Sequence, residues 1–243
     1  MNTTVLGYAL LAALANLIGG LLITTASPRG IRAQRTLLGF GAGFMLAVAI
    51  LAMLPHALEQ GAQGAFWVLA GYILVHITQH VLTPHFHFGE ETHTEAMLDR
   101  WVGTAALLGL LLHTFFDGVA ITSAFDVGTS LGIVVFLAVF VHKVPEGVTA
   151  ASIMIVSGSS KGRALLGAAL LGASTLAGVL LTALVEPLAQ HGLAISAGVT
   201  LYVATSNLIP EVQKERDLVS GGSVILGMLV YMMAQWLLPA LPG

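Results

Sequence analysis

The stretch that decides the fold is Trp101–Val156, which reads WVGTAALLGLLLHTFFDGVAITSAFDVGTSLGIVVFLAVFVHKVPEGVTAASIMIV. It holds two apolar segments, and each carries the pattern H-x-x-x-[D/E]-G at its middle, from His113 to Gly118 and from His142 to Gly147. The two histidines lie 29 residues apart, which fits one membrane crossing plus a short turn. Because residues four apart share a helix face, each segment presents an imidazole beside a carboxylate. Two such faces turned toward each other make a metal site.

The candidate ligands of this site are two imidazoles and two carboxylates: His113, Asp117, His142 and Glu146. A charged group in the middle of a bilayer costs about 3 kcal/mol or more and persists where it pairs, faces a cavity or serves transport. The alternative is that a histidine and a carboxylate merely satisfy each other within one helix, and the repetition argues against it. These ligands suit zinc and its first-row neighbours, whereas magnesium and calcium prefer oxygen alone.

Composition assigns the chain to the integral membrane proteins. Of its 243 residues 56% are hydrophobic and only 9% are charged, with a mean hydropathy of +0.91, whereas soluble domains carry about 25% charged residues. Eight spans of about 20 residues nearly exhaust this length, so we expect one transmembrane domain over residues 1–243 in a lipid bilayer, and no nucleic-acid partner. Cysteine is absent, which excludes disulfides and thiolate ligands.

The apolar runs predict an all-α, polytopic fold of eight transmembrane helices. A polar loop at about 83–100 contains His85, His87 and His93 and is too polar to enter the bilayer. The second and seventh spans end in Leu-Pro-His and Ile-Pro-Glu, which favours an inverted repeat of helices 1–3 and 6–8 around helices 4–5. We expect the spans at about Val5–Ala26, Thr36–Leu58, Ala65–Leu82, Trp101–Ala124, Leu131–Val156, Ala164–Val185, Ile195–Ile209 and Val224–Leu238.

The basic residues predict the orientation, because cytoplasmic loops of membrane proteins are enriched in Lys and Arg. All but one lie in the odd-numbered loops, and the exception, Lys143, lies inside a span. Both termini are therefore expected outside and the His-rich loop in the cytoplasm, in a plasma (inner) membrane. The loop residues are Arg29, Arg32, Arg35, Arg100, Lys161, Arg163, Lys214 and Arg216.

H-x-x-x-D-G followed by H-K-x-P-E-G in consecutive apolar helices resembles the fourth and fifth transmembrane helices of the ZIP (Zrt/Irt-like) metal transporters. The resemblance implies an eight-helix importer of divalent metal ions, bound between these two helices. It also implies a homodimer in which a bundle including them slides against a scaffold. The transported ion would be zinc, with iron, manganese and cadmium as alternatives. On this interpretation the chain is not an enzyme and has no resident cofactor.

Further residues are candidates for the transport path. The resemblance suggests a methionine-like ligand from the second span, where Met45 lies, although a lone Met on an apolar helix commonly serves packing. His56 shares a face with Met45 and, with Glu59, is a candidate for an outer mouth, unless it is a capping or interfacial histidine. At the cytoplasmic ends of the third and seventh spans, the candidates to receive metal are His76, His80 and Glu211. The loop histidines either bind metal weakly or belong to a solvated linker.

The motifs depart from the fuller ZIP pattern where many members carry asparagine. Thr114 and Lys143 occupy these positions, and the sixth span offers Ser174 and Thr175 but no central acid. We therefore expect a mononuclear site, with the Lys143 ammonium paired to the two carboxylates in place of a second metal. The alternative is that Lys143 snorkels into a water-filled cavity.

The rival hypothesis is an intramembrane zinc-dependent hydrolase, in which the same ligands would activate a metal-bound water. The chain contains no H-E-x-x-H motif. Four protein ligands would also leave a tetrahedral zinc little room for a reactive water. The sequence therefore favours a transporter.

Overall fold

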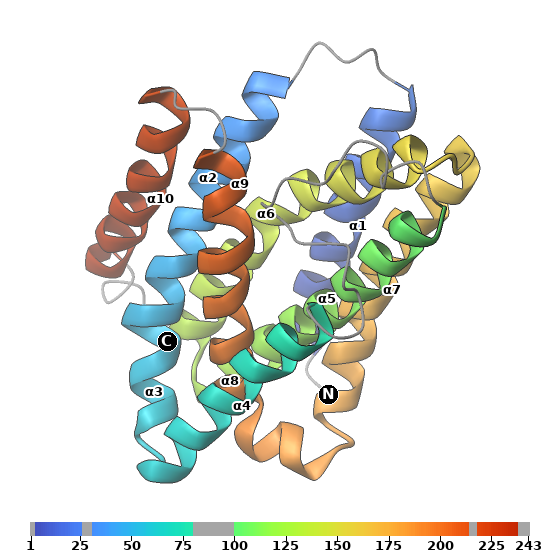
Figure 1. Cartoon of the computed structure of the whole chain (residues 1–243). Helices are drawn as coiled ribbons and strands as arrows, with labels where there is room; N and C mark the ends of the chain where they lie inside the picture. The colour runs from blue at the N-terminus through green and yellow to red at the C-terminus, as the bar shows by residue number, and fades with distance from the viewer. Residues whose placement is uncertain (1–2, 26–30, 80–99, 214–217, 238–243) are drawn as a thin grey trace.

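The computed structural model describes residues 3–25, 31–79, 100–213 and 218–237, and every regular element within these ranges is helical (Figure 1). In a membrane this is expected, because a helix satisfies its own backbone hydrogen bonds. In chain order the elements are α1 (Thr3–Thr25), α2 (Ile31–Val48), the π-helical η1 (Ala49–Met53), α3 (Leu54–Leu58), α4 (Ala62–Ile77), α5 (Arg100–Val127), α6 (Thr129–Val156), α7 (Lys161–Thr182), α8 (Glu186–Tyr202), the π-helical η4 (Val203–Leu208), α9 (Ile209–Gln213) and α10 (Leu218–Leu237).

Seven helical stretches in the described part of the chain are long and apolar enough to cross a membrane. The apolar helix α4 has 16 residues and is shorter than these. The all-α polytopic fold agrees with the sequence-based expectation, while the eighth span and the inverted repeat remain predictions. The seven stretches are Thr3–Thr25, Thr36–Leu58, Leu107–Val127, Thr129–Val156, Lys161–Thr182, Glu186–Gln213 and Leu218–Trp236.

Several helix ends differ from the expected spans. We placed Glu186 at the end of the sixth span, but α7 ends at Thr182 and Glu186 begins α8. An acidic residue followed by proline is favourable in the first helical turn, where the dipole is positive and a backbone N–H is not needed. Helix α10 likewise begins at Leu218, ahead of the apolar run that predicted it. A run of apolar residues identifies the part of a helix that can cross the hydrocarbon core, but the helix continues into polar residues that such a run does not include.

The helices form two bundles that lie side by side (Figure 1). The site bundle contains α1, α5, α6 and α7, which pack mainly on one another. The flanking bundle contains α2, α4, α8 and α10 with their short continuations, in which α2 packs on α10 and α4 packs on α8. The main contacts between the bundles run from α2 to α6 and from α5 to α8. The histidines of both motifs, His113 and His142, therefore belong to the same bundle.

Reciprocal glycine contacts bring the backbones together within each bundle. A Cβ atom on Gly118 would lie 2.0 Å from the Thr175 carbonyl oxygen, and one on Gly178 would lie 2.0 Å from that of Phe115. The same arrangement recurs at three other helix pairs, and small residues are the usual means of close approach in membranes. The glycine pairs are Gly19 and Gly147 for α1–α6, Gly118 and Gly178 for α5–α7, Gly43 and Gly227 for α2–α10, and Gly71 and Gly198 for α4–α8.

Contacts between the bundles are of a different kind. At Gly41 of α2 the nearest atom to an added Cβ is the His142 Cβ, at 3.3 Å. At Gly192 of α8 the nearest atom is the Ser123 hydroxyl oxygen. At these two glycines the other bundle presents a side-chain atom first, whereas the glycine pairs within a bundle meet backbone.

Two π-helical segments precede prolines in the flanking bundle. Segment η1 lies directly before Leu54-Pro55, and η4 lies directly before Ile209-Pro210. A proline inside a helix lacks the N–H and crowds the carbonyl four residues earlier, and a π turn is one way to absorb that misfit. The structure therefore gives both Pro-containing span ends the same local geometry.

The glycine contacts generate a stability prediction. We expect Gly118→Ala to destabilise the protein by about 1–3 kcal/mol, because the added methyl group meets the α7 backbone. Gly109→Ala on the same helix is the matched control, since a Cβ there meets nothing within 4 Å, and alanine is the better helix former by about 1 kcal/mol. Apparent melting temperatures of the two purified variants measure the difference. Equal melting temperatures would contradict the proposed role of this crossing.

Candidate metal site

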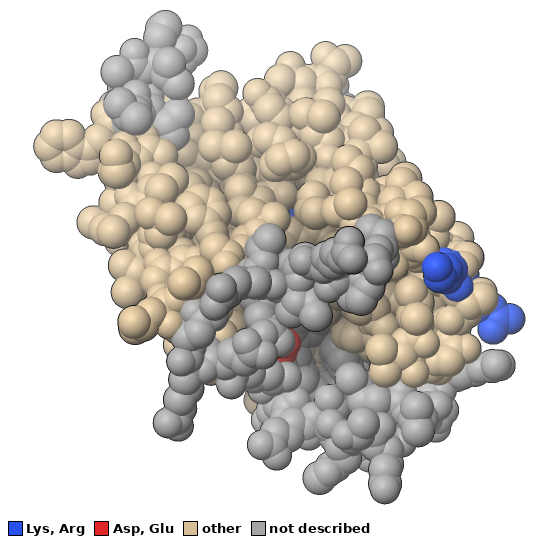
Figure 2. Space-filling view, turned by 90° about the horizontal axis from the view of Figure 1, so that it is seen from above, with Lys and Arg blue, Asp and Glu red and all other residues tan. Residues whose placement is uncertain are grey.

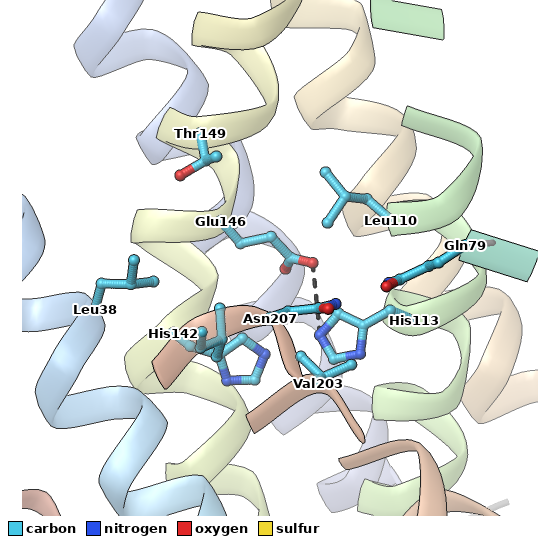
Figure 3. A pocket seen from close by; sticks show the side chains of 10 residues that line it. Leu38, Gln79, Leu110, His113, His142, Glu146, Thr149, Val203 and Asn207 are labelled. Atoms are coloured by element: carbon cyan, nitrogen blue, oxygen red, sulfur yellow. Dashed lines mark ion pairs between the residues drawn. The ribbon is translucent and has the colours of Figure 1, made fainter. Parts of the chain in front are cut away.

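Helices α5 and α6 bring the four predicted ligands together. His113 and Asp117 lie one turn apart on α5, and His142 and Glu146 lie one turn apart on α6. All four side chains are buried, with exposed fractions of 6% or less. Each offers one ligand atom such that all four atoms lie within 4.8 Å of one another. Figure 3 shows His113, His142 and Glu146 pointing toward one another from the two helices.

Three separations between the ligand atoms are close to those around a tetrahedral metal ion. Asp117 Oδ2 lies 3.4 Å from Nε2 of His113 and 3.4 Å from Nε2 of His142. Glu146 Oε1 lies 3.7 Å from His113 Nε2. Ligands at about 2.0–2.2 Å from a tetrahedral zinc ion are separated from one another by about 3.3–3.6 Å. Three of the six separations are therefore at or near the tetrahedral value, and all four ligand atoms lie within 4.8 Å of one another.

Several buried polar atoms around this space have no hydrogen-bond partner. These atoms are His113 Nδ1, His142 Nε2 and Glu146 Oε1. The other ring nitrogen of His142, Nδ1, lies 2.8 Å from the Ala138 carbonyl oxygen, so it is assigned as the N–H donor. Nε2 then carries the lone pair, in the arrangement by which metal-binding histidines are oriented. Unpaired buried acceptors are costly, and an ion bound among the four side chains would satisfy His142 Nε2 and Glu146 Oε1.

Lys143 lies beside the site and pairs with both of its carboxylates. Its side chain is fully buried. Nζ donates to Asp117 Oδ2 at 2.5 Å and to Glu146 Oε2 at 2.8 Å. The structure thus places the ammonium between the two acids rather than in a water-filled cavity, which was the alternative. Removing one partner from such a buried pair typically costs about 3–5 kcal/mol.

Threonine and serine hydroxyls near the site are bound to backbone carbonyl groups. Thr114 Oγ1 donates to the Leu111 carbonyl at 3.0 Å, and Ser174 Oγ donates to the same carbonyl at 2.7 Å. Thr175 Oγ1 donates to the Leu171 carbonyl at 3.3 Å. In this structure the three hydroxyls therefore form hydrogen bonds with helix backbones and do not contact the candidate ligands.

A small cavity of about 20 Å³ adjoins the candidate ligands. Water needs a space of about 10–15 Å³ on this measure, so the cavity has room for one water-sized body. Sequence reasoning missed the polar residues that line it, Gln79, Thr149 and Asn207 (Figure 3). Asn207 comes from η4 of the flanking bundle and is buried. In the sequence, the feature that could have identified Asn207 as a candidate is its position two residues before Ile209-Pro210-Glu211.

The cavity lies on one side of the ligands along the helices. Its lining residue Leu110 precedes His113, and Thr149 follows Glu146, so both are displaced toward the end where α5 begins and α6 ends. That end is seen in Figure 2, with blue basic side chains at its edge. Lys161 and Arg163, at the start of α7, both have exposed side chains. The cavity therefore faces the side predicted to be cytoplasmic.

The predicted outer residues lie toward the opposite end. His56 is half-buried in α3, with Nδ1 at 2.8 Å from the Ala52 carbonyl oxygen, and it borders a second cavity of about 410 Å³. Glu59 caps α3 and is exposed. Met45 is buried in the core of α2 and does not line the small cavity. Its role as a ligand remains a prediction.

The predicted cytoplasmic residues are dispersed. His76 lies exposed in the last turn of α4, with its ring 5.8 Å from that of Tyr202. Glu211 is half-buried in α9. His80 and the His-rich loop at 83–100 lie outside the described residues, except for the first residue of α5, Arg100. A path through His76 and Glu211 therefore remains a prediction.

Asn16 of α1 is a further residue that sequence reasoning missed. It is fully buried. With the amide nitrogen facing acceptors, the side chain donates to Glu146 Oε2 at 3.2 Å and to the Lys143 carbonyl at 2.7 Å. The available signal was a lone amide within the first apolar run, but no neighbouring residue in the sequence indicates its partner. Helix α1 thus contributes directly to the surroundings of the site.

Comparison with known proteins identifies related chains. The family model described as "ZIP Zinc transporter" matches residues 87–238, more than half of the chain. Zinc transporter zipt-7.1 of Caenorhabditis briggsae is 25% identical over 246 aligned residues, covering 75% of this chain and 63% of the relative. Zinc transporter zipt-7.2 of Caenorhabditis elegans is 36% identical over 107 residues, covering 41% and 23%. Zinc transporter SLC39A7 of Canis lupus familiaris is 31% identical over 159 residues, covering 61% and 33%. The chain thus spans less than two thirds of each relative.

Proposed function

The chain belongs to the ZIP zinc transporter family, and from this membership we propose that it carries zinc ions across a membrane. The ion binds between α5 and α6, at His113, Asp117, His142 and Glu146. The observation that carries the proposal is the 3.4–3.7 Å spacing of buried ligand atoms from both helices. Two imidazole nitrogens and two carboxylate oxygens form a complete tetrahedral set for zinc. Iron, manganese and cadmium remain alternative substrates.

The direction of transport is inward, with the small cavity as the cytoplasmic half of the path. The predicted orientation supports this, since the cavity lies toward the end that carries Lys161 and Arg163. Glu211 and His76 are candidates to receive the ion there. His56 and Glu59 are candidates for the opposite mouth.

Alternating access arises from an elevator-like displacement of the site bundle along the flanking bundle. All four ligands belong to the site bundle, so the ion would travel with it. Close backbone crossings lie within the bundles, whereas Gly41 and Gly192 meet side chains of the other bundle. A surface of side chains can slide, while interlocked backbones move together. The homodimer and the plasma-membrane location implied by the family resemblance are further proposals.

The site holds one ion, because Lys143 occupies the place of a second. With both carboxylates ionised, the empty site carries −2, and the Lys143 ammonium brings it to −1. One divalent ion makes the charge +1, and a second would make it +3, which a low-dielectric site tolerates poorly. The hydroxyls of Thr114 and Thr175 are bound to backbone carbonyl groups and offer no acid for another ion.

The hydrolase alternative has no support from the comparisons. The three relatives described above are named zinc transporters and not enzymes. Four protein ligands also complete a tetrahedral zinc, which leaves no open position for an activated water. We therefore retain transport as the proposed function.

Removal of a ligand tests the site. We expect His142→Ala and Glu146→Ala each to reduce uptake of radiolabelled zinc into proteoliposomes to the level of protein-free liposomes. The control is His191→Ala, since His191 lies half-buried in α8, where its ring stacks on that of Trp67 and makes no contact with the proposed ligands; it should transport like the parent. Normal zinc uptake by either correctly inserted variant would contradict the assignment of that residue as a metal ligand. Competition by iron, manganese and cadmium in the same assay ranks the substrates.

Metal stoichiometry tests the role of Lys143. We expect the parent protein to bind one ion between α5 and α6, and Lys143→Asp to permit a second close by, because it replaces a cation with a ligand. Lys143→Met removes the charge without adding a ligand, so it should still bind one. Elemental analysis of the purified proteins, with anomalous diffraction to locate the ions, gives the counts. Two closely spaced ions in the parent would refute the proposal.

A further inference from the structure

We propose that Asn16 is a positioning residue that holds Glu146 as a one-oxygen ligand and thereby favours zinc over ions that need more ligands. The inference rests on the proposed function of the site. It concerns a residue of α1, whereas the four proposed ligands lie on α5 and α6. Its basis is the different surroundings of the two oxygens of one carboxylate.

The backbone crossing of α1 and α6 fixes where the Asn16 amide lies. A Cβ on Gly147 would meet the Asn16 carbonyl oxygen at 2.1 Å, and a Cβ on Gly19 would meet the Val144 carbonyl oxygen at 2.2 Å. These two glycines bring the helices into contact immediately beside Glu146. A fully buried amide at this crossing has little freedom to move, so its donors are held against α6.

The amide and the ammonium together occupy one oxygen of Glu146. Oε2 accepts from Asn16 at 3.2 Å and from Lys143 Nζ at 2.8 Å. A carboxylate oxygen has about two lone-pair sites, so these two donors saturate it. The second Asn16 contact, to the Lys143 carbonyl at 2.7 Å, holds the amide in this orientation.

The other oxygen of Glu146 is left for the ion. Oε1 is buried, has no hydrogen-bond partner, and lies 3.7 Å from His113 Nε2. Glu146 also lines the small cavity. The carboxylate can therefore offer a metal Oε1, while chelation through both oxygens would require Oε2 to give up its donors.

Restricting Glu146 to one oxygen has a consequence for selectivity. Zinc in protein sites is commonly satisfied by four ligands in a tetrahedron. Manganese prefers an octahedral shell rich in oxygen, which a chelating carboxylate helps to complete. By keeping Oε2 occupied, Asn16 holds the ligand number down and disfavours manganese. Loss of Asn16 frees one lone pair, while Lys143 still restrains the other.

The test compares zinc and manganese binding by the purified full-length parent and Asn16→Ala. Loss of an outer partner typically weakens metal affinity about 10–100-fold. We expect a rise of this size in the zinc Kd by calorimetry, with a smaller rise for manganese, so that the preference for zinc falls. Thr24→Val is the matched control on α1, since the Thr24 hydroxyl is bound to the Gly20 carbonyl of its own helix; it should leave the preference unchanged. A purely structural role for Asn16 would lower the melting temperature without altering the preference.

X-ray absorption spectroscopy of zinc bound to the parent gives a readout that does not depend on how the variant folds. We expect four nearest nitrogen and oxygen neighbours. Five or more neighbours, or an unchanged zinc-to-manganese preference in folded Asn16→Ala, would overturn the inference. Either result with intact, His142-dependent uptake in proteoliposomes leaves the proposed function standing. Conversely, if Asn16→Ala changes the preference for zinc but the parent protein transports no zinc, the proposed function is wrong and the positioning role of Asn16 stands.

Discussion

The shared ammonium of Lys143 is the interaction on which the rest of the site depends. Two carboxylates buried in an apolar bundle would repel each other strongly at low dielectric, and their histidine neighbours are neutral unless protonated. Lys143 lies within 2.8 Å of both acids, which allows them to stay ionised close together. It also binds Asp117 and Glu146 through the oxygens Oδ2 and Oε2, so it helps to determine how each acid faces the histidines. Lys143 thus contributes both to the charge balance of the site and to the orientation of its two carboxylates.

The glycine that ends each motif connects these ligands to the packing of the fold. Gly118 follows Asp117 and brings α5 against α7, while Gly147 follows Glu146 and brings α6 against α1. Each carboxylate therefore lies one residue from a close backbone crossing. The pattern H-x-x-x-[D/E]-G accordingly joins two requirements, a ligand pair on one face and a close helix contact beside it.

The convergence of the two motifs was predictable because helical periodicity and the cost of buried charge act locally and can be read from residue types. The first residues of α8 and α10 were not predictable from hydrophobicity, since Glu186 and Leu218 lie before the apolar runs that indicated these helices. Asn16 was not predictable either, because its partner lies on a distant segment and meets it through the crossing at Gly19 and Gly147. Sequence periodicity identifies the face of a helix but not which neighbour that face meets.

The two cavities lie on opposite sides of the candidate ligands, an arrangement that bears on the proposed movement of whole bundles. The small cavity adjoins the ligands on one side, and the larger one, bordered by His56 and Ala52, lies toward the opposite end. Along α2 between these regions, Met45 and Val48 are buried in the core, so apolar packing separates the outer cavity from the ligands. Opening a route by loosening single helices would break backbone crossings within a bundle. In the proposed elevator-like motion the site bundle would move as one body, which keeps those crossings and changes the contacts between bundles, such as the ones at Gly41 and Gly192.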